Sequence, residues 1–249
     1  FDPFVYLGLL AGQTEEIGLG VASIVLPLRH PAHVAKAAAS ADILSGGRLI
    51  LGVASGDRPD EYPAMALPFA DRGERFRESF EYIKRMWEDA PEFESPYGSL
   101  NLTTPAGGMD MLPKPMSGKL PLLVTGGSQQ HPDWLAQNGD GWMIYPRAKQ
   151  LQSQVIGEWR AQIAAEGGSD RPVMEPLYID LADDSETPPQ PIHLGLRLGV
   201  SHLRAYLRSR QEIGVNHVAL NLRFNKSDIE TTLKRLADDV LPEFSGQGD

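Results

Sequence analysis

The chain of 249 residues has 33 acidic and 23 basic side chains, a formal charge of −10, and no cysteine. This charge disfavours nonspecific nucleic-acid binding, which depends on clustered cations that release phosphate counterions. The lack of cysteine excludes disulfides, thiolate metal sites and thiol nucleophiles. The sequence contains no run of about 18 apolar residues, and its first residues lack the basic start of a secretory signal. We therefore predict a cytoplasmic globular protein that binds neither nucleic acid nor membrane.

The first part of the chain alternates helices and strands. Apolar spacing predicts a helix over 4–14, and a run of small and β-branched residues predicts a strand over 18–25. Pro31 suits the first turn of an Ala-rich helix over 32–44. Glycines end that helix, and an almost continuously apolar strand follows over 48–54. A helix that joins two such strands indicates a parallel sheet.

The alternation continues to the end of the chain. Amphipathic spacing predicts a helix over 76–87, and residues 88–119, rich in Pro, Gly, Ser and Thr, read as a long excursion. A Pro-rich acidic loop is expected over 183–190, inside a longer connection over 182–199. The other predicted elements are strands over 120–125, 141–145, 174–181 and 217–222 and helices over 128–138, 148–165, 200–213 and 227–241. With no break in composition, the pattern predicts one domain over 1–249.

Two architectures cover a parallel sheet with helices, the doubly wound sheet and the (β/α)₈ barrel. A doubly wound sheet usually has a Gly-x-Gly-x-x-Gly turn after its first strand, and this chain has none. The barrel is therefore preferred, although only six strands can be counted. In barrel enzymes the functional groups lie in the loops after the strands, so the residues that follow each predicted strand are the candidates for a site.

The loop after 120–125 reads TGGSQQH, from Thr125 to His131, and is the strongest candidate. Its two glycines let the backbone approach a ligand. Ser128 is expected to cap the next helix, whose unpaired amide groups favour an anion such as phosphate. An ordinary strand-to-helix turn with a serine cap explains the same residues without a ligand.

Arg72 and Arg75 lie one helical turn apart at the start of a helix, where cations oppose the helix dipole. Binding of a phosphate would explain both side chains. Surface ion pairs with Asp71, Glu74 and Glu78 would also explain them, and the residues alone favour that second explanation.

His30 follows the first predicted strand, where a neutral imidazole can exchange a proton or bond its own loop. His33 is close by, but no carboxylate and third histidine stand at ligand spacing, so no metal site is predicted. Trp142 ends the fourth strand, and Asp180 and His193 flank the acidic loop. Core packing is the simpler explanation for Trp142.

Five motifs follow one another with a characteristic spacing: ASIVLP at 22–27, HP at 30–31, LSGGR at 44–48, GGS at 126–128 and NGDGW at 138–142. Together they resemble the luciferase-like monooxygenase family, the flavin-dependent barrel enzymes related to bacterial luciferase. The segments LRHPAHVAKAAAS and LGVASGDRP resemble in particular a group of short oxidoreductases in that family.

This resemblance implies a luciferase-like (β/α)₈ barrel that binds FMN, with a deazaflavin as the less favoured cofactor. It implies a monooxygenase that uses FMN reduced by a separate flavin reductase, together with O₂, on a small organic substrate that the sequence does not identify. A homodimer is expected as well. Three alternatives stay open: a deazaflavin-dependent oxidoreductase, a non-catalytic flavin-binding or structural barrel, and a barrel enzyme for a phosphorylated sugar.

The resemblance also implies roles for individual residues. The peptide between Ala22 and Ser23 corresponds to a position that is often non-prolyl cis in the family and supports the isoalloxazine ring. His30 is the expected catalytic contact near that ring. The positions that match the family's phosphate contacts, or lie beside them, are Ser55, Gly56, Arg72, Arg75, Thr125, Gly126, Gly127, Ser128 and His131.

One feature departs from the family pattern. Family members begin with a strand, a helix and a second strand, whereas this chain begins in the helix before the third strand. We therefore expect upstream sequence on the order of 60 to 80 residues, by the usual size of a βα repeat, which would supply the two barrel strands that are absent from this chain.

Overall fold

Two compact units make up the chain in the computed structural model. Unit 1 comprises residues 1–143 and unit 2 comprises residues 144–249. The structure describes residues 1–101, 103–104, 107–108 and 110–244. The single domain expected over the whole chain stays a prediction, and each unit is described by itself below.

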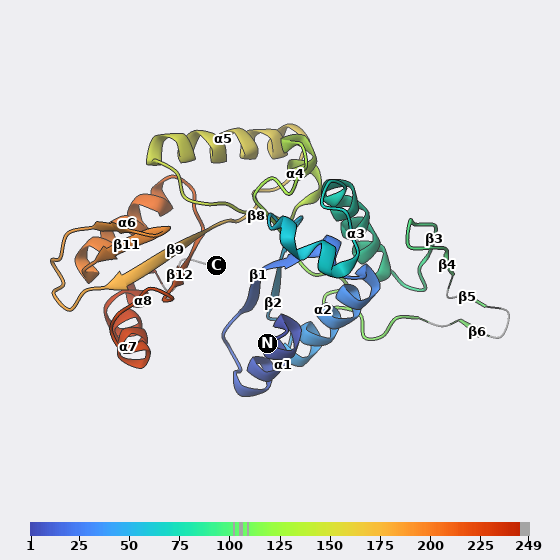
Figure 1. The fold of residues 1–249 in the computed structure, drawn as a ribbon, viewed down its shortest axis with the longest axis horizontal. Helices are drawn as coiled ribbons and strands as arrows, with labels where there is room; N and C mark the ends of the chain where they lie inside the picture. The colour runs from blue at the N-terminus through green and yellow to red at the C-terminus, as the bar shows by residue number, and fades with distance from the viewer. Residues whose placement is uncertain (102, 105–106, 109, 245–249) are drawn as a thin grey trace. The chain divides into compact units, whose positions relative to one another are not determined.

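Unit 1 contains a parallel sheet whose strands follow the chain order (Figure 1). Its strands are β1 (Leu19–Val25), β2 (Leu49–Ala54), β7 (Leu122–Thr125) and β8 (Gly141–Met143). Leu19 pairs with Leu49 and Val25 with Ala54, and the register shifts between Val21 and Ile24. The peptide between Ala22 and Ser23, within that shift, is cis, as the family resemblance implies.

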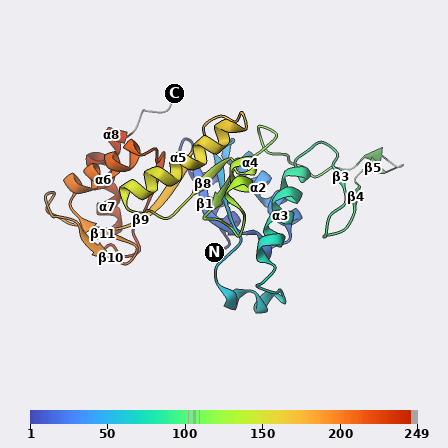
Figure 2. The same ribbon diagram turned by 90° about the horizontal axis from the view of Figure 1, so that it is seen from above.

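Four α-helices connect these strands or precede them. They are α1 (Pro3–Gln13), α2 (Pro31–Ser45), α3 (Arg72–Met86) and α4 (Pro132–Asn138). α1 packs against α2, and α2 packs against α3. A short 3₁₀ helix, η1 (Leu26–Leu28), follows β1. Two more, η2 (Pro59–Glu61) and η3 (Pro63–Met65), lie in the loop between β2 and α3. This loop is cyan in Figure 2.

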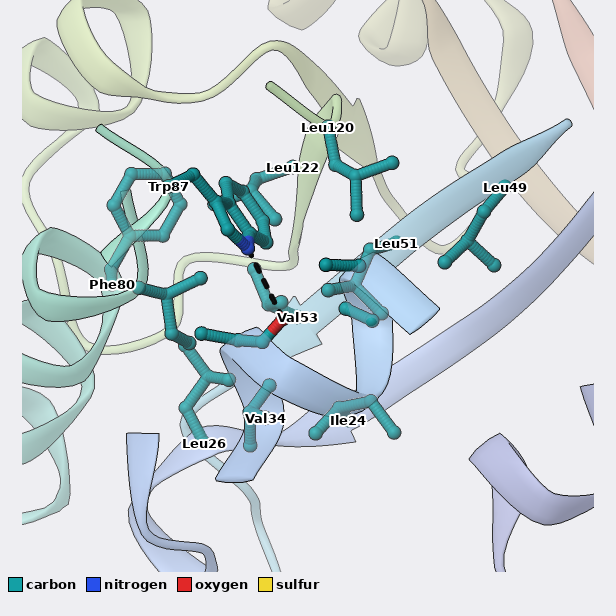
Figure 3. Close-up of a cluster of buried hydrophobic side chains, with 14 of the residues drawn as sticks. Ile24, Leu26, Val34, Leu49, Leu51, Val53, Phe80, Trp87, Leu120 and Leu122 are labelled. Atoms are coloured by element: carbon teal, nitrogen blue, oxygen red, sulfur yellow. Dashed lines mark hydrogen bonds between the residues drawn. The ribbon is translucent and has the colours of Figure 1, made fainter. Parts of the chain in front are cut away.

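The core of unit 1 lies between α2, α3 and the sheet (Figure 3). Ala35 and Ala38 of α2 are fully buried, and their small side chains let the helix approach the strands closely. Val53 of β2 and Phe80 of α3 are also fully buried, and each such side chain stabilises the fold by about 1.5–3 kcal/mol. The indole nitrogen of Trp87 donates to the carbonyl of Ala35 at 3.1 Å, which satisfies both buried polar groups.

Unit 2 is built around β9 (Val173–Leu181). This strand pairs in parallel with β12 (His217–Asn221) on one side and with β11 (Gly195–Leu198) on the other. β10 (Gln190–Ile192) pairs antiparallel with β11. The helices of unit 2 are α5 (Lys149–Ala165), α6 (Val200–Glu212), α7 (Ile229–Asp239) and α8 (Leu241–Phe244). Its core includes Leu177, Ile179, Leu198, Leu203 and Leu236.

Two long connections contain more structure than the sequence predicts. The expectation of a loop over 182–199 is wrong, because β10 and β11 lie within it. A side chain at Gly195 would approach the carbonyl oxygen of Tyr178 to 1.8 Å, so the close pairing of β11 with β9 depends on this glycine.

The excursion over 88–119 contains paired segments as well. β3 (Glu92–Phe93) pairs antiparallel with β4 (Leu100–Asn101), and β5 (Thr103–Thr104) pairs with β6 (Gly107–Gly108). Pro105, one of the prolines that mark this excursion, lies outside the described residues.

The predicted alternation of strands and helices is confirmed as a mixed α/β fold with mainly parallel strand pairing. Barrel closure is not detected in the part of the chain that the structure describes. Within the same residues, no helix combines the length and apolar character needed to cross a membrane.

Candidate cofactor site

The loop after β2 is fixed by bonds to two other segments of unit 1. The buried Ser55 donates its amide to the hydroxyl oxygen of Ser128 at 3.3 Å, and its carbonyl accepts a hydrogen bond from the hydroxyl of Tyr62. Gly56 has a φ of 77°, and a Cβ there would lie 2.7 Å from Cγ1 of Val25. A glycine is therefore required directly after Ser55.

The loop after β7 forms a tight turn before the next helix begins. Ser128 and Gln129 have φ values of 43° and 59°, in the left-handed region. The Ser128 hydroxyl donates to the carbonyl of Thr125 at 2.8 Å. The amide groups of Gly127, Ser128 and Gln129 have no acceptor among the described residues. Such amide groups are suited to bind an anion.

The prediction that Ser128 caps a helix is wrong. α4 begins at Pro132, and its N-cap is His131, whose Nδ1 accepts from the amide of Asp133 at 3.4 Å. The sequence does contain the signal for this start, because Pro is favoured in the first helical turn. His30 and Pro31 start α2 in the same way.

The start of α3 is joined to the loop after β7 by Gln130, a residue that the sequence analysis did not single out. Its side-chain amide donates to the carbonyl of Gly73 at 2.7 Å, and its side-chain oxygen accepts from Nε of Arg77 at 3.0 Å. A Cβ at Gly73 would lie 2.7 Å from the Cβ of Gln129. The close contact therefore depends on glycine at position 73.

Arg72 and Arg75, on the first turn of α3, lack partners for buried nitrogen atoms. Nε of each side chain is buried and has no hydrogen-bond partner in the structure. Neither arginine forms an ion pair with any described residue, so the surface ion pairs favoured by the residues alone are not found. Because unsatisfied buried donors are costly, the pair fits a bound anion such as a phosphate.

His30, the predicted catalytic residue, is the N-cap of α2. Its Nδ1 accepts from the amide of Ala32 at 3.3 Å, so a neutral His30 carries its proton on Nε2. Rings of Tyr97 and Tyr82 lie edge-on to the imidazole at 5.2 and 6.2 Å between centroids. Partial burial, assisted by His33, lowers the pKa of His30 below its usual value of 6.5. The neutral donor form therefore predominates at neutral pH.

A cavity of about 370 Å³ in unit 1 is lined by both His30 and Arg75. Leu28, Met65 and Tyr97 contribute apolar surface to it. Glu78 also lines it, and burial together with Glu74 raises the pKa of this carboxyl group above its usual value, against the opposing effect of Arg75. A second cavity, of about 480 Å³, lies between α1 and α2 and is also lined by His30. A larger one, of about 650 Å³ in unit 2, contains none of the predicted site residues.

The remaining predicted residues lie at or beside these loops. Trp142 packs against the core of unit 1, as expected, and its indole nitrogen donates to the carbonyl of Gly126 at 2.8 Å. His131 is exposed at the start of α4. The structure thus joins the loop after β2, the start of α3 and the loop after β7. The role of each residue in holding a cofactor stays a prediction.

The sequence model of the luciferase-like monooxygenase family matches residues 1–241. The chain belongs to this family. Among curated members, it is 26% identical to the oxygenase component of the flavin-dependent trigonelline monooxygenase of Acinetobacter baylyi, over 88% of this chain and 60% of that protein. The chain spans 47% to 60% of the length of the curated relatives it matches.

Solved structures support the same fold for this luciferase-like chain. Monooxygenase RslO1 of Streptomyces bottropensis superposes with a TM-score of 0.83 and 20% identity, over 98% of this chain and 83% of that one. An F420-dependent secondary alcohol dehydrogenase, in complex with an F420–acetone adduct, superposes with a TM-score of 0.79 and 16% identity, over 99% and 85%. At these identities the likeness concerns the fold alone.

Proposed function

We propose that this luciferase-like protein is the oxygenase of a flavin-dependent monooxygenase that binds reduced FMN and oxygenates a small organic substrate. The observation that carries the proposal is the pair of buried, unpartnered Nε atoms of Arg72 and Arg75. Two guanidinium groups in one helical turn match the charge and the acceptor oxygens of a phosphate. An arginine pair that served only the fold would be expected to have partners within the chain.

The residues around this pair complete the proposed phosphate site. Arg72 and Arg75 would bind the phosphate through their guanidinium groups. Amide groups in the loop from Thr125 through Gly126, Gly127 and Ser128 would donate to its oxygens, since no described residue accepts from three amides of that loop. Ser55 and Gly56 would form the opposite wall, and His131 would lie at the rim.

The ring end of the cofactor would lie over β1, against the peptide between Ala22 and Ser23. Reduced FMN, when bound, supplies the electrons that activate oxygen. The chain would orient the ring and exclude water from the reacting atoms. His30 would hold a proton on Nε2 and donate a hydrogen bond from the wall of the 370 Å³ cavity.

Two partners belong to the proposal. A separate flavin reductase would supply the reduced cofactor, as the designation of the Acinetobacter relative as an oxygenase component suggests. A second copy of the chain would form a homodimer. Val5, Tyr6 and Leu9 expose apolar side chains along α1, and a contiguous exposed apolar surface often marks an interface.

A second candidate function is hydride transfer with the deazaflavin F420. It is favoured by the 29% identity, over 73% of this chain and 54% of that protein, with the F420-dependent glucose-6-phosphate dehydrogenase of Kineococcus radiotolerans. F420 also carries a phosphate group, so the arginine pair fits both cofactors. A non-catalytic flavin-binding protein would require the phosphate site but no turnover.

The test compares the two cofactors directly. The protein is titrated with FMN and with F420, and binding is followed by flavin fluorescence, for wild type, Arg75→Gln and the matched variant Arg85→Gln on the same helix. We expect stoichiometric FMN binding that Arg75→Gln weakens and Arg85→Gln does not. Binding of F420 but not FMN would favour the second candidate, and binding of neither would overturn both.

Turnover is tested with NADH, a flavin reductase and a panel of small organic compounds. Substrate-dependent incorporation of labelled oxygen into a product is expected of a monooxygenase. FMN binding without any substrate-dependent product would favour the non-catalytic alternative.

A further inference from the structure

Tyr62 lies in the loop between β2 and α3 and contacts residues beside two parts of the proposed phosphate site, the loop after β2 and the start of α3. It is fully buried, and its hydroxyl donates to the carbonyl of Ser55. This carbonyl and the amide of Gly56 belong to one planar peptide group, so a bond that fixes the carbonyl also fixes the direction of the amide. The amide of Gly56 has no acceptor among the described residues.

The ring of Tyr62 connects the same loop to Arg72. It lies edge-on to the ring of Phe69, with 5.1 Å between the centroids. Phe69 in turn lies under the guanidinium group of Arg72, 3.8 Å from ring centroid to Cζ, and its carbonyl accepts from Nη1 of Arg72 at 3.1 Å. These contacts hold one side of the guanidinium group, whereas its buried Nε has no hydrogen-bond partner in the part of the chain that the structure describes.

We propose that Tyr62 and Phe69, here called the aromatic support, position Arg72 and the peptide between Ser55 and Gly56 to bind the phosphate of the cofactor. Tyr62 acts as a positioning residue rather than as a direct ligand, because its hydroxyl hydrogen is donated to Ser55 and only oxygen lone pairs remain. Oxygen lone pairs repel an anion. This role rests on the proposed function, and neither Tyr62 nor Phe69 belongs to the motifs that the chain shares with the family.

The charge around Tyr62 agrees with this arrangement. Burial raises the pKa of the phenol above its usual value of 10, and the nearby Arg72 and Arg75 oppose this rise without overcoming it. The hydroxyl therefore keeps its hydrogen at every pH at which the protein would be assayed, and its bond to Ser55 persists.

The test uses riboflavin, which carries the same ring system as FMN but no phosphate. Dissociation constants of the full chain for both compounds are measured by fluorescence titration, for wild type, Tyr62→Phe and Phe69→Leu. We expect Tyr62→Phe to weaken FMN binding about tenfold, as for loss of one well-placed hydrogen bond, and to leave riboflavin binding unchanged. Phe69→Leu should weaken FMN binding about threefold, because it removes a cation–π contact but keeps an apolar side chain.

Tyr206→Phe in unit 2 is the matched control, because its ring also lies beside an arginine, 5.8 Å from Cζ of Arg210. It should leave the ratio of FMN to riboflavin affinity at the wild-type value. Equal weakening of both ligands by Tyr62→Phe, or no weakening of either, would overturn the inference. If Tyr62→Phe does not fold, as judged by circular dichroism, the ratio for Phe69→Leu decides in the same way. A wild-type protein without preference for FMN over riboflavin would instead overturn the proposed phosphate site.

Discussion

Arg210 in unit 2 and Arg75 in unit 1 are both helix arginines with buried nitrogen atoms, but among the described residues only the side chain of Arg210 has hydrogen-bonding partners. Its Nε donates to Oε2 of Glu175 at 2.8 Å and its Nη2 to Oε1 at 2.6 Å. Its Nη1 donates to the carbonyl of Arg147 at 3.2 Å. The side chain of Arg75 forms no hydrogen bond or ion pair with any described residue. The side chain of Arg72, one turn away, forms a single hydrogen bond with the described residues, from Nη1 to the carbonyl of Phe69.

The difference separates arginines that hold the fold together from arginines suited to a ligand. A buried charge is tolerated when a carboxylate and further hydrogen bonds satisfy it, as in the pair of Arg210 with Glu175. Arg160 shows why ion pairs must be considered as well as hydrogen bonds. Its buried Nε lacks a hydrogen bond of good geometry, yet it lies 2.7 Å from a carboxylate oxygen of Asp170. Nε of Arg72 and Nε of Arg75 lack both kinds of partner among the described residues, which points to a partner from outside the chain.

The largest expected effect concerns the paired arginine. Glu175→Gln leaves the buried Arg210 without its carboxylate, and also disturbs the bond from the side-chain amide of Gln152 to Glu175. We expect the free energy of unfolding to fall by about 3–5 kcal/mol, as is usual when one partner of a buried ion pair is removed. Urea unfolding followed by circular dichroism measures this change.

An exposed pair provides the control for this prediction. Lys149 and Glu212 form an ion pair on the surface of unit 2, with 2.6 Å between nitrogen and oxygen. Because water screens such pairs, Glu212→Gln should leave the urea midpoint unchanged. If Glu175→Gln and wild type unfold at the same urea concentration, the buried and fully partnered Arg210 does not stabilise the fold. The contrast with Arg75 would then be lost.

Much of the fold of unit 1 follows from local sequence patterns. The first strand, the Ala-rich helix and the second strand were predicted to within a few residues, because Pro31 and Gly46 mark the two ends of α2. α3 was predicted from apolar residues at helical spacing, and Phe76, Phe80 and Ile83 are buried as that spacing requires. Arg72 and Arg75 were identified as candidates because cations are unfavourable at a helix start.

Features that depend on contacts between distant residues could not be predicted in this way. β11 exists because Gly195 allows close approach to Tyr178, and no local pattern reveals that contact. Gln130 reaches the carbonyl of Gly73 across 57 residues of sequence. The acidic residues next to Arg72 and Arg75 in the sequence favour surface ion pairs. Only the folded chain shows that these carboxylates form no ion pair with either arginine.

An intermediate effect is expected at the unpartnered arginine. Arg75→Gln should weaken FMN binding about 10- to 100-fold, equal to about 1.4–2.8 kcal/mol, because a charge-assisted contact is lost. The free energy of unfolding of the cofactor-free protein should stay the same or rise, because the variant no longer buries an unsatisfied guanidinium nitrogen. Arg75→Gln should therefore not cause the loss of stability that is expected of Glu175→Gln.

Arg85→Gln tests whether the position on α3 matters. Arg85 lies in the last turn of the same helix, where a cation is favoured, and it donates to the carbonyl of Glu92 at 2.9 Å. This variant should leave FMN affinity unchanged. A clear loss of stability in cofactor-free Arg75→Gln, measured by urea unfolding, would mean that Arg75 has a structural partner and would remove the contrast with Arg210.

The smallest effect is expected at His30, whose Nδ1 accepts from the amide of Ala32 and whose Nε2 has no hydrogen-bond partner among the described residues. Asn is a good helix N-cap and offers an acceptor oxygen in place of Nδ1, so His30→Asn should keep α2 capped and leave stability at pH 8 unchanged. Because the pKa of His30 is lowered in the folded chain, the unfolded chain binds more protons as the pH falls through 6.5, and folding loses stability there. The variant should lose less stability than wild type between pH 7 and pH 5, as measured by thermal unfolding.

His131→Asn is the control for His30→Asn, because His131 caps α4 through the same atom and also precedes a proline. Its side chain is 75% exposed, and its Nδ1 lies 2.9 Å from a carboxylate oxygen of Asp133, a partner that His30 does not have among the described residues. The imidazole of His30 faces His33, Tyr82 and Tyr97, and none of these is changed in either variant. His131→Asn should therefore not reproduce the smaller loss of stability between pH 7 and pH 5 that is expected of His30→Asn. If both variants flatten the dependence of stability on pH equally, the surroundings of His30 do not cause that dependence. His30 would then act as an ordinary helix-capping residue.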